Sequence, residues 1–137
     1  FIAFLLLCCL CLFVFDFNDH PTNQWEAVNV RGQDIVFMKN DATEIVTLAP
    51  MGDGSFAVTV LDYEQDAFAQ AEDMKIELDA KTIYLPIAQS SKSGATTFIS
   101  KRQFDDFKVS KKAAFTFDDF SVEVDLEGLR KALEAVH

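Results

Sequence analysis

The sequence predicts a mostly β (α+β) fold: an antiparallel β-sandwich or barrel-like sheet built of hairpins, with a short helix near residues 101–108 and a C-terminal amphipathic helix over residues 126–136. From Trp25 onward, turn signals recur about every eight to twelve residues, which is typical of short antiparallel strands. Between the turns, apolar and polar side chains mostly alternate, as they do in strands that bury one face. Helical patterns interrupt this alternation in a few places only.

Four strands are expected first. They are WEAVNV (25–30), DIVFM (34–38), EIVTL (44–48) and SFAVTVL (55–61). A turn at residues 51–54 should join the last two of these strands. A short helix is expected after Asp62, because Gln65 stands at the spacing of a capping box. The apolar face of that helix would consist of Tyr63, Ala67, Ala71 and Met74.

Residues 74–87, MKIELDAKTIYLPI, predict a hairpin with one buried face. Apolar side chains alternate on both sides of a turn at residues 79–81 and would point the same way from both strands. Pro86 has no amide hydrogen to donate, which places the second strand at a sheet edge or marks its end. Residues 89–97, QSSKSGATT, are polar, and a loop is expected there.

A short repeat, FDDFKV at residues 104–109 and FDDFSV at residues 117–122, predicts two different structures. Ser100 and Gln103 have capping-box spacing before the first copy, so a helix should begin there and bury Phe104 and Phe107. The second copy favours a hairpin with a two-residue turn at its aspartates. The expected cross-strand pairs are Phe117–Phe120, Phe115–Val122 and Ala113–Val124.

The final segment, DLEGLRKALEAVH, predicts the C-terminal helix. Asp125 is the expected N-cap, and Glu127 and Lys131 stand at the i,i+4 spacing of a supporting ion pair. The apolar stripe that should pack on the sheet consists of Leu126, Leu129, Leu133 and Val136.

The chain opens with an apolar run, FIAFLLLCCLCLFVF, and we interpret residues 1–17 as a signal peptide or an N-terminal membrane anchor. Fifteen helical residues reach about 22 Å, short of the roughly 30 Å core of a bilayer, which favours a signal peptide. The small residues that cleavage needs are missing after the run, which favours an anchor and weighs against lipoprotein processing. A buried hydrophobic hairpin in a soluble protein is the remaining alternative.

The residues after this run indicate export. Acidic residues follow it and no Lys or Arg precedes Arg31, so the rest of the chain is expected on the periplasmic or extracellular side of the inner membrane. Residues 18–24 would form a polar tether, and residues 25–137 a single β-rich domain.

The composition argues against several classes of site and partner. All three cysteines, Cys8, Cys9 and Cys11, lie in the apolar run, which excludes a disulfide scaffold and a Cys zinc site in the domain. A net charge of −10 argues against nucleic acid as a partner. The histidines are His20 and His137, so a His-based catalytic site would need a terminal residue. We therefore predict no catalytic, cofactor-binding or metal-binding residue, no cofactor and no enzymatic activity.

Two acidic features allow a functional alternative. The four aspartates of the repeat, Asp105, Asp106, Asp118 and Asp119, could form a paired-carboxylate or calcium site, and residues 52–55, GDGS, could form a phosphate or calcium loop. The repeat lacks the graded oxygen spacing of a calcium loop, and GDGS lacks a following helix and a lysine. For the aspartates of the repeat we favour a helix surface in the first copy and a solvated turn in the second. For GDGS we favour a hairpin turn.

Several segments after Met74 follow one another in a familiar order. They are IELDAKTIYLPI, SKSGATTFIS, QFDDF and SKKAAFTF, then DLEGL followed by Ala132-Leu133, and Trp25 stands early in the domain. In these segments the chain resembles the invasion-associated locus B family of exported bacterial envelope proteins. Where that family carries cysteines around the polar loop, this chain has Ser90, Ser91, Gly94 and Ala95.

The resemblance implies an exported, mostly β, non-enzymatic protein that is linked to the cell envelope and, in some pathogens, to host-cell interaction. The main hypothesis is therefore an exported domain that binds a protein or another envelope component. A second hypothesis is an accessory subunit of a membrane complex, anchored in the membrane through residues 1–17 if these are not cleaved. The third is an uncharacterised enzyme, for which no catalytic residue can be named.

Overall fold

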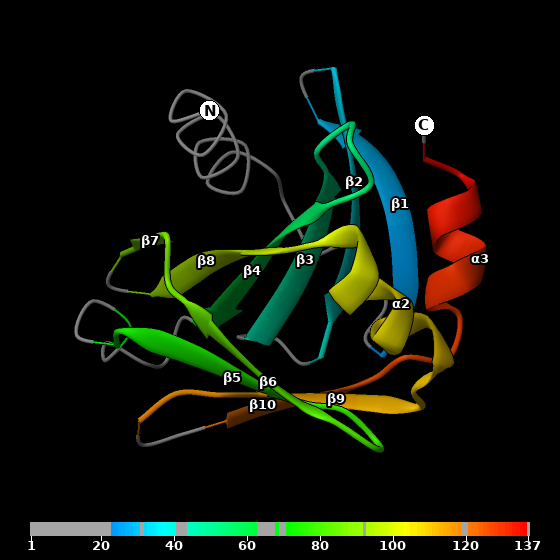
Figure 1. Ribbon diagram of the computed structural model, residues 1–137. Coiled ribbons are helices and arrows are strands. Elements are labelled where there is room, and N and C mark those ends of the chain that lie inside the picture. The colour runs from blue at the N-terminus through cyan, green and yellow to red at the C-terminus, as the bar shows by residue number, and fades with distance from the viewer. Residues whose placement is uncertain are drawn as a thin grey trace.

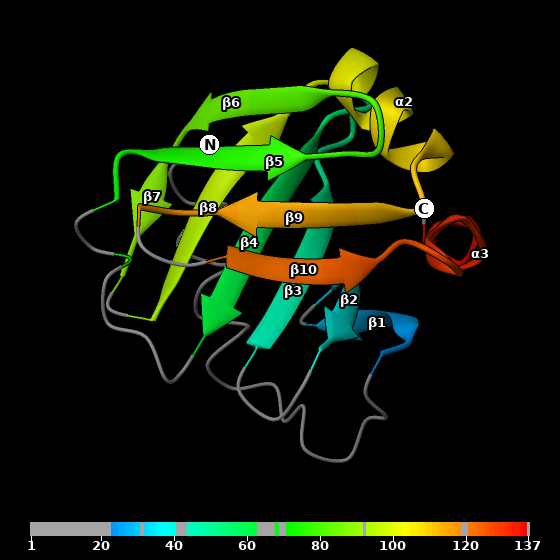
Figure 2. The same cartoon turned by 90° about the horizontal axis from the view of Figure 1, so that it is seen from below.

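The computed structural model describes residues 23–30, 32–40, 44–62, 68, 71–91, 93–118 and 121–136. In this part of the chain, two antiparallel sheets pack face to face, with two helices beside them (Figure 1). Figure 2 shows that the strands of the smaller sheet cross those of the larger sheet at an angle. The mostly β fold is thus confirmed, and of the two predicted forms the sandwich is the one that the chain adopts.

The larger sheet contains the four strands predicted at the start of the domain. They are β1 (Trp25–Val30), β2 (Gln33–Lys39), β3 (Glu44–Pro50) and β4 (Phe56–Asp62). Two further strands, β7 (Gln89–Ser90) and β8 (Gly94–Ile99), complete the order β1-β2-β3-β4-β8-β7. The turn expected at residues 51–54 joins β3 to β4, and it is closed by a bond from the Met51 N–H to the Ser55 carbonyl oxygen (3.0 Å).

The smaller sheet consists of the two predicted hairpins, side by side in the order β10-β9-β5-β6. Its strands are β5 (Asp73–Glu77), β6 (Thr82–Pro86), β9 (Lys112–Thr116) and β10 (Ser121–Asp125). Strand β6 lies at the edge, as Pro86 predicts. The pairs Phe115–Val122 and Ala113–Val124 form as expected, whereas Phe120 lies outside the described residues.

The main core lies between the two sheets and is rich in aromatic side chains. Phe104 stacks on Phe56, with ring centroids 4.0 Å apart, and Phe107 lies 5.9 Å from Phe104 and 6.1 Å from Phe115. Phe104, Phe107 and Phe115 are almost fully buried. This aromatic row attaches the helix that follows β8 to both sheets.

That helix, α2 (Lys101–Val109), begins as the sequence predicts. The Ser100 hydroxyl accepts a hydrogen bond from the Gln103 N–H (3.2 Å), and the Ser100 N–H donates to Gln103 Oε1 (3.0 Å). These two bonds satisfy groups that would otherwise lack partners at a helix start. Phe104 and Phe107 are the buried residues of α2, as predicted.

The C-terminal helix is shorter than predicted, because α3 covers only Leu129–Glu134. Asp125 is not its N-cap: the carboxylate accepts from the Glu127 N–H (2.8 Å) and turns the chain directly after β10. The N-cap is Gly128, which has a φ of 86° that a residue with a side chain rarely adopts. Glu127 therefore precedes the helix, and the predicted pair with Lys131 is not an intrahelical one.

The loop predicted at residues 89–97 is wrong for most of its length, because residues 89–90 form β7 and residues 94–97 belong to β8. The threonine hydroxyls that suggest a loop are buried and hydrogen-bonded. Thr96 Oγ1 lies 2.8 Å from Thr59 Oγ1, and Thr97 Oγ1 donates to the Pro86 carbonyl oxygen (2.7 Å). Threonine also has a branched side chain that suits strands. Partners far along the chain thus make this polar segment a buried strand.

The helix predicted after Asp62 does not extend to Met74 as expected. Asp62 is the last residue of β4, and Met74 belongs to β5. Residues 63–67 and 69–70 lie outside the described residues, and Phe68 packs its ring edge against Phe117 (4.8 Å between centroids).

The predicted signal peptide or anchor at residues 1–17, and most of the predicted tether, also lie outside the described residues. In the part that is described, from Asn23 onward, neither helix is long and apolar enough to cross a membrane.

Candidate functional site

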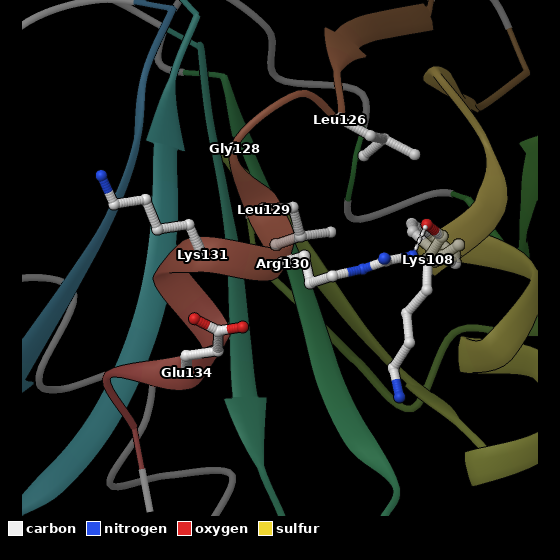
Figure 3. A pocket seen from close by; sticks show the side chains of 8 residues that line it. Lys108, Leu126, Gly128, Leu129, Arg130, Lys131 and Glu134 are labelled. Carbon is white, nitrogen blue, oxygen red and sulfur yellow. Dashed lines mark hydrogen bonds between the residues drawn. The ribbon is translucent and has the colours of Figure 1, made fainter.

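A groove of about 430 Å³ separates α2 from α3, at the open end of the sandwich (Figure 3). Residues of α2, of α3 and of the turn before α3 line it. They are Phe107, Lys108, Leu126, Gly128, Leu129, Arg130, Lys131 and Glu134. We call this the α2–α3 groove.

The wall formed by α2 is fixed by the core. Phe107 is turned inward, so the next residue, Lys108, is exposed at the end of the helix. Its ammonium lies 3.6 Å from Asp105 Oδ1 and 5.6 Å from the centroid of the Phe104 ring. Both contacts are weak at an exposed site. The lysine can therefore turn toward an anionic group at little cost.

The wall formed by α3 is tied to α2 by Arg130. Leu129 and Ala132 are buried, which leaves Arg130 and Lys131 exposed on the outer side of the helix. The Arg130 Nη2 donates to the carbonyl oxygen of Lys108 (3.1 Å), as Figure 3 shows. A carbonyl in the last turn of a helix lacks an intrahelical partner, so this bond satisfies it.

The groove is cationic although the chain is acidic. Lys108, Arg130 and Lys131 line it together with a single acidic residue, Glu134, while the whole chain has a net charge of −10. Arginine presents five N–H donors in a planar fork that suits carboxylates. The groove can thus attract a negatively charged group although the net charge of the chain is negative.

The apolar part of the groove gives it a second property. Phe107, Leu126 and Leu129 contribute to its lining beneath the charged residues. A cationic rim over an apolar base suits a peptide that combines acidic and apolar side chains. None of this lining was predicted as a site, because Lys108 stands 22 and 23 positions before Arg130 and Lys131 and only the fold brings the three cations together.

The aspartates of the repeat do not gather at one place in the described part of the chain. Asp105 pairs with Lys108, and Asp106 pairs with Lys81 across to the β5–β6 turn (3.0 Å). Asp118 is exposed, and Asp119 lies outside the described residues. Among the described residues, no group of three His, Cys, Asp or Glu side chains stands close enough together to hold a metal ion.

The GDGS segment is a hairpin turn, as favoured from the sequence. Asp53 accepts hydrogen bonds from the hydroxyl and from the backbone N–H (2.9 Å) of Ser55. These bonds, the hydroxyl bond first, lower the pKa of Asp53 below its ordinary value of 3.8. On the smaller sheet, a hydrogen bond to Glu77 raises the pKa of Lys75. Both groups lie outside the α2–α3 groove.

The comparisons with known proteins bear on the fold. No family model and no curated protein sequence matches this chain. Its structure is similar to the crystal structure of invasion associated protein B from Bartonella henselae, with a TM-score of 0.61 and 14% sequence identity. The similarity covers 84% of this chain and 92% of that chain. At this identity it demonstrates a shared fold, which agrees with the fold implied by the resemblance in sequence.

Proposed function

We propose that this chain is an exported, non-enzymatic domain of the cell envelope that binds an acidic segment of a partner protein in the α2–α3 groove. The observation that carries the proposal is the cationic lining of this groove in a chain with a net charge of −10. The fold likeness to invasion associated protein B supports an envelope role. The apolar run at residues 1–15 and the acids after it support export.

The geometry suits recognition of carboxylates. Arg130 is held by its bond to the Lys108 carbonyl oxygen, so part of its conformational freedom is already lost before a ligand arrives. Lys108 and Lys131 are exposed and stand at opposite sides of it. Because the charges are at the surface, the affinity should fall as the salt concentration rises.

A binding measurement with a polyglutamate peptide tests the groove. The full chain is titrated with the peptide at low salt, and binding is followed by calorimetry. The test variant combines Lys108→Glu with Lys131→Glu. We expect its affinity for the peptide to fall by a factor of at least about ten, since two attractions become repulsions. Circular dichroism checks that the variant is folded.

The control variant combines Lys75→Glu with Lys112→Glu. It has the same net charge as the test variant. The two lysines that it replaces lie on the smaller sheet, where they pair with Glu77 and Glu123. If the control loses as much affinity as the test variant, only the net charge matters and the groove is not the site. If neither variant loses affinity, the proposal is wrong.

Export has its own test, which is the mass of the mature chain in the membrane and soluble fractions of the native cell. A mass that lacks residues 1–17, or a full-length chain in the membrane fraction, is the expected result. A full-length chain in the cytosol would contradict export.

A further inference from the structure

A second hollow continues the α2–α3 groove toward the start of α2. It has a volume of about 250 Å³, and Lys108 lines both hollows. From α2 it is lined by Lys101 and Phe104 as well, and from the other side by Leu133 of α3 and Val136, which follows α3. The two hollows therefore follow one another along the pair of helices. We call the second hollow the Phe104 pocket.

The Phe104 pocket has a mainly apolar lining. Phe104 and Phe56, whose rings stack with centroids 4.0 Å apart, both contribute to it, together with Pro50. Phe104 is buried, whereas Phe56, Leu133 and Val136 are only partly buried. Apolar side chains that are still in contact with water release that water when another apolar group covers them. The pocket thus suits an apolar side chain of a partner.

Lys101 adds a positive charge at the edge of the pocket. Its side chain lies over the β3–β4 turn, where a Cβ on Gly54 would stand only 2.8 Å from Lys101 Cδ. Lys101 is exposed, and within the described part of the chain it forms no ion pair. The same holds for Arg130 and Lys131 in the groove, although the chain has 22 acidic residues and only 12 lysines and arginines. The two hollows therefore keep positive charge that carboxylates of the described residues do not neutralise.

Lys108 connects the two hollows. Its ammonium lies 5.6 Å from the centroid of the Phe104 ring, on the side of the Phe104 pocket, and Figure 3 shows it turned away from Arg130. A ligand that occupies both hollows would thus meet cations along its whole length.

We propose that the Phe104 pocket takes one aromatic side chain of the same acidic segment that the α2–α3 groove binds. This inference rests on the proposed function and specifies the partner: an aromatic residue next to a run of acidic residues. The pocket is smaller than the roughly 300–1,000 Å³ of sites that enclose whole small ligands, so it suits a single side chain. The stacked rings of Phe56 and Phe104 offer faces and edges to a third ring. Aromatic residues in such pockets often carry much of the affinity of an interface.

The charge of the chain favours a peptide over a membrane or a second copy as the occupant. A net charge of −10 repels an anionic lipid surface as a whole, and it repels another copy of the same chain. A short peptide is small enough to approach the cations of the cleft without meeting the acids elsewhere on the surface.

Two polyglutamate peptides of equal charge test the pocket. One carries Phe-Gly at its end and the other Ala-Gly, and each is made with the pair at the N-terminus and at the C-terminus. The full chain is titrated with each peptide by calorimetry at low salt. In one of the two directions, we expect the phenylalanine peptide to bind at least about tenfold more tightly than its alanine counterpart, because a phenylalanine ring leaves water.

The test variant is Val136→Phe, which supplies a ring to the pocket from the chain itself. In this variant the two peptides should bind equally well, and binding of the alanine peptide should stay as in the parent. The matched control is Val109→Phe, the same change at a residue that is 77% exposed at the end of α2 and does not line the pocket. It should keep the full preference for phenylalanine. Circular dichroism checks that both variants are folded, and the comparison of peptides on the parent chain needs no variant.

Several results would overturn the inference. If the parent binds both peptides equally in both directions, the pocket takes no aromatic side chain, while the proposed function still stands. If neither peptide binds, the proposed function fails and this inference fails with it. If folded Val136→Phe keeps the preference, the ring binds elsewhere. If phosphatidylglycerol vesicles displace the phenylalanine peptide, the occupant is a lipid surface, and if dimerisation of the chain displaces it, the occupant is a second copy.

Discussion

Trp25 should contribute strongly to the attachment of the two sheets. Its indole is 7% exposed at the start of β1, and the Nε1 donates a hydrogen bond to the backbone carbonyl oxygen of Asp125 (2.7 Å) at the end of β10. The two residues are 100 positions apart and belong to different sheets. The Trp25→Phe variant keeps an aromatic ring but removes the N–H donor and part of the side-chain volume.

The expected loss has two parts. Removing the hydrogen bond and leaving the Asp125 carbonyl oxygen without this donor costs about 1 kcal/mol. The smaller ring leaves a cavity between the sheets, which adds about 1–2 kcal/mol if the surroundings relax only in part. The free energy of unfolding should therefore fall by about 2–3 kcal/mol, a large share of the 5–15 kcal/mol of a typical domain.

Urea unfolding measured by far-ultraviolet circular dichroism is the suitable assay. Fluorescence is not, because Trp25 is the only tryptophan of the chain. Tyr84→Phe is the matched control, since Tyr84 is 69% exposed and the change should cost less than about 0.5 kcal/mol. If Trp25→Phe also costs less than about 0.5 kcal/mol with an unchanged urea dependence, the indole does not hold the sheets together.

Three further predictions concern single groups. Ser100→Ala should lower the free energy of unfolding by about 1 kcal/mol, measured by urea unfolding, and Gln103→Ala should cost little in that background, because the two side chains form one capping box. Thr47→Val should leave the free energy of unfolding unchanged or raise it by up to about 1 kcal/mol, because it removes a buried hydroxyl that has no partner in the described part of the chain. Ser55→Ala should raise the pKa of Asp53 toward 3.8 in an NMR titration. Since the folded-state pKa is the lower one, the stabilisation from Asp53 is present above the unfolded-state pKa and lost as pH falls through the folded-state pKa, so acid unfolding should begin at a higher pH in Ser55→Ala.

Local patterns in the sequence were sufficient where the stabilising groups are close together in the chain. Ser100 and Gln103 are three residues apart, and the helix that they start was predicted with its buried Phe104 and Phe107. The hairpin of β9 and β10 was predicted in its register for the same reason, since alternation and a short turn fix the pairing.

Local patterns were misleading where a polar side chain has more than one possible partner. Residues 89–97 look like a loop until Thr96 and Thr97 meet Thr59 and the Pro86 carbonyl oxygen. Asp125 looks like an N-cap until the chain turns at the end of β10, so that its carboxylate binds the Glu127 N–H before the helix begins at Gly128. In each case a polar side chain had several possible partners, and only the assembled fold selects one.

The sequence by itself determined the β-rich class, the four first strands, the two hairpins and the start of α2, because apolar periodicity and capping act over a few residues. Tertiary structure alone decided how the sheets pair, that β8 is buried, and that Lys108 meets Arg130 across the α2–α3 groove. It also decided that the larger sheet is buried on both faces. Burial depends on which residues lie around a side chain in space, and these residues can be far away in the sequence.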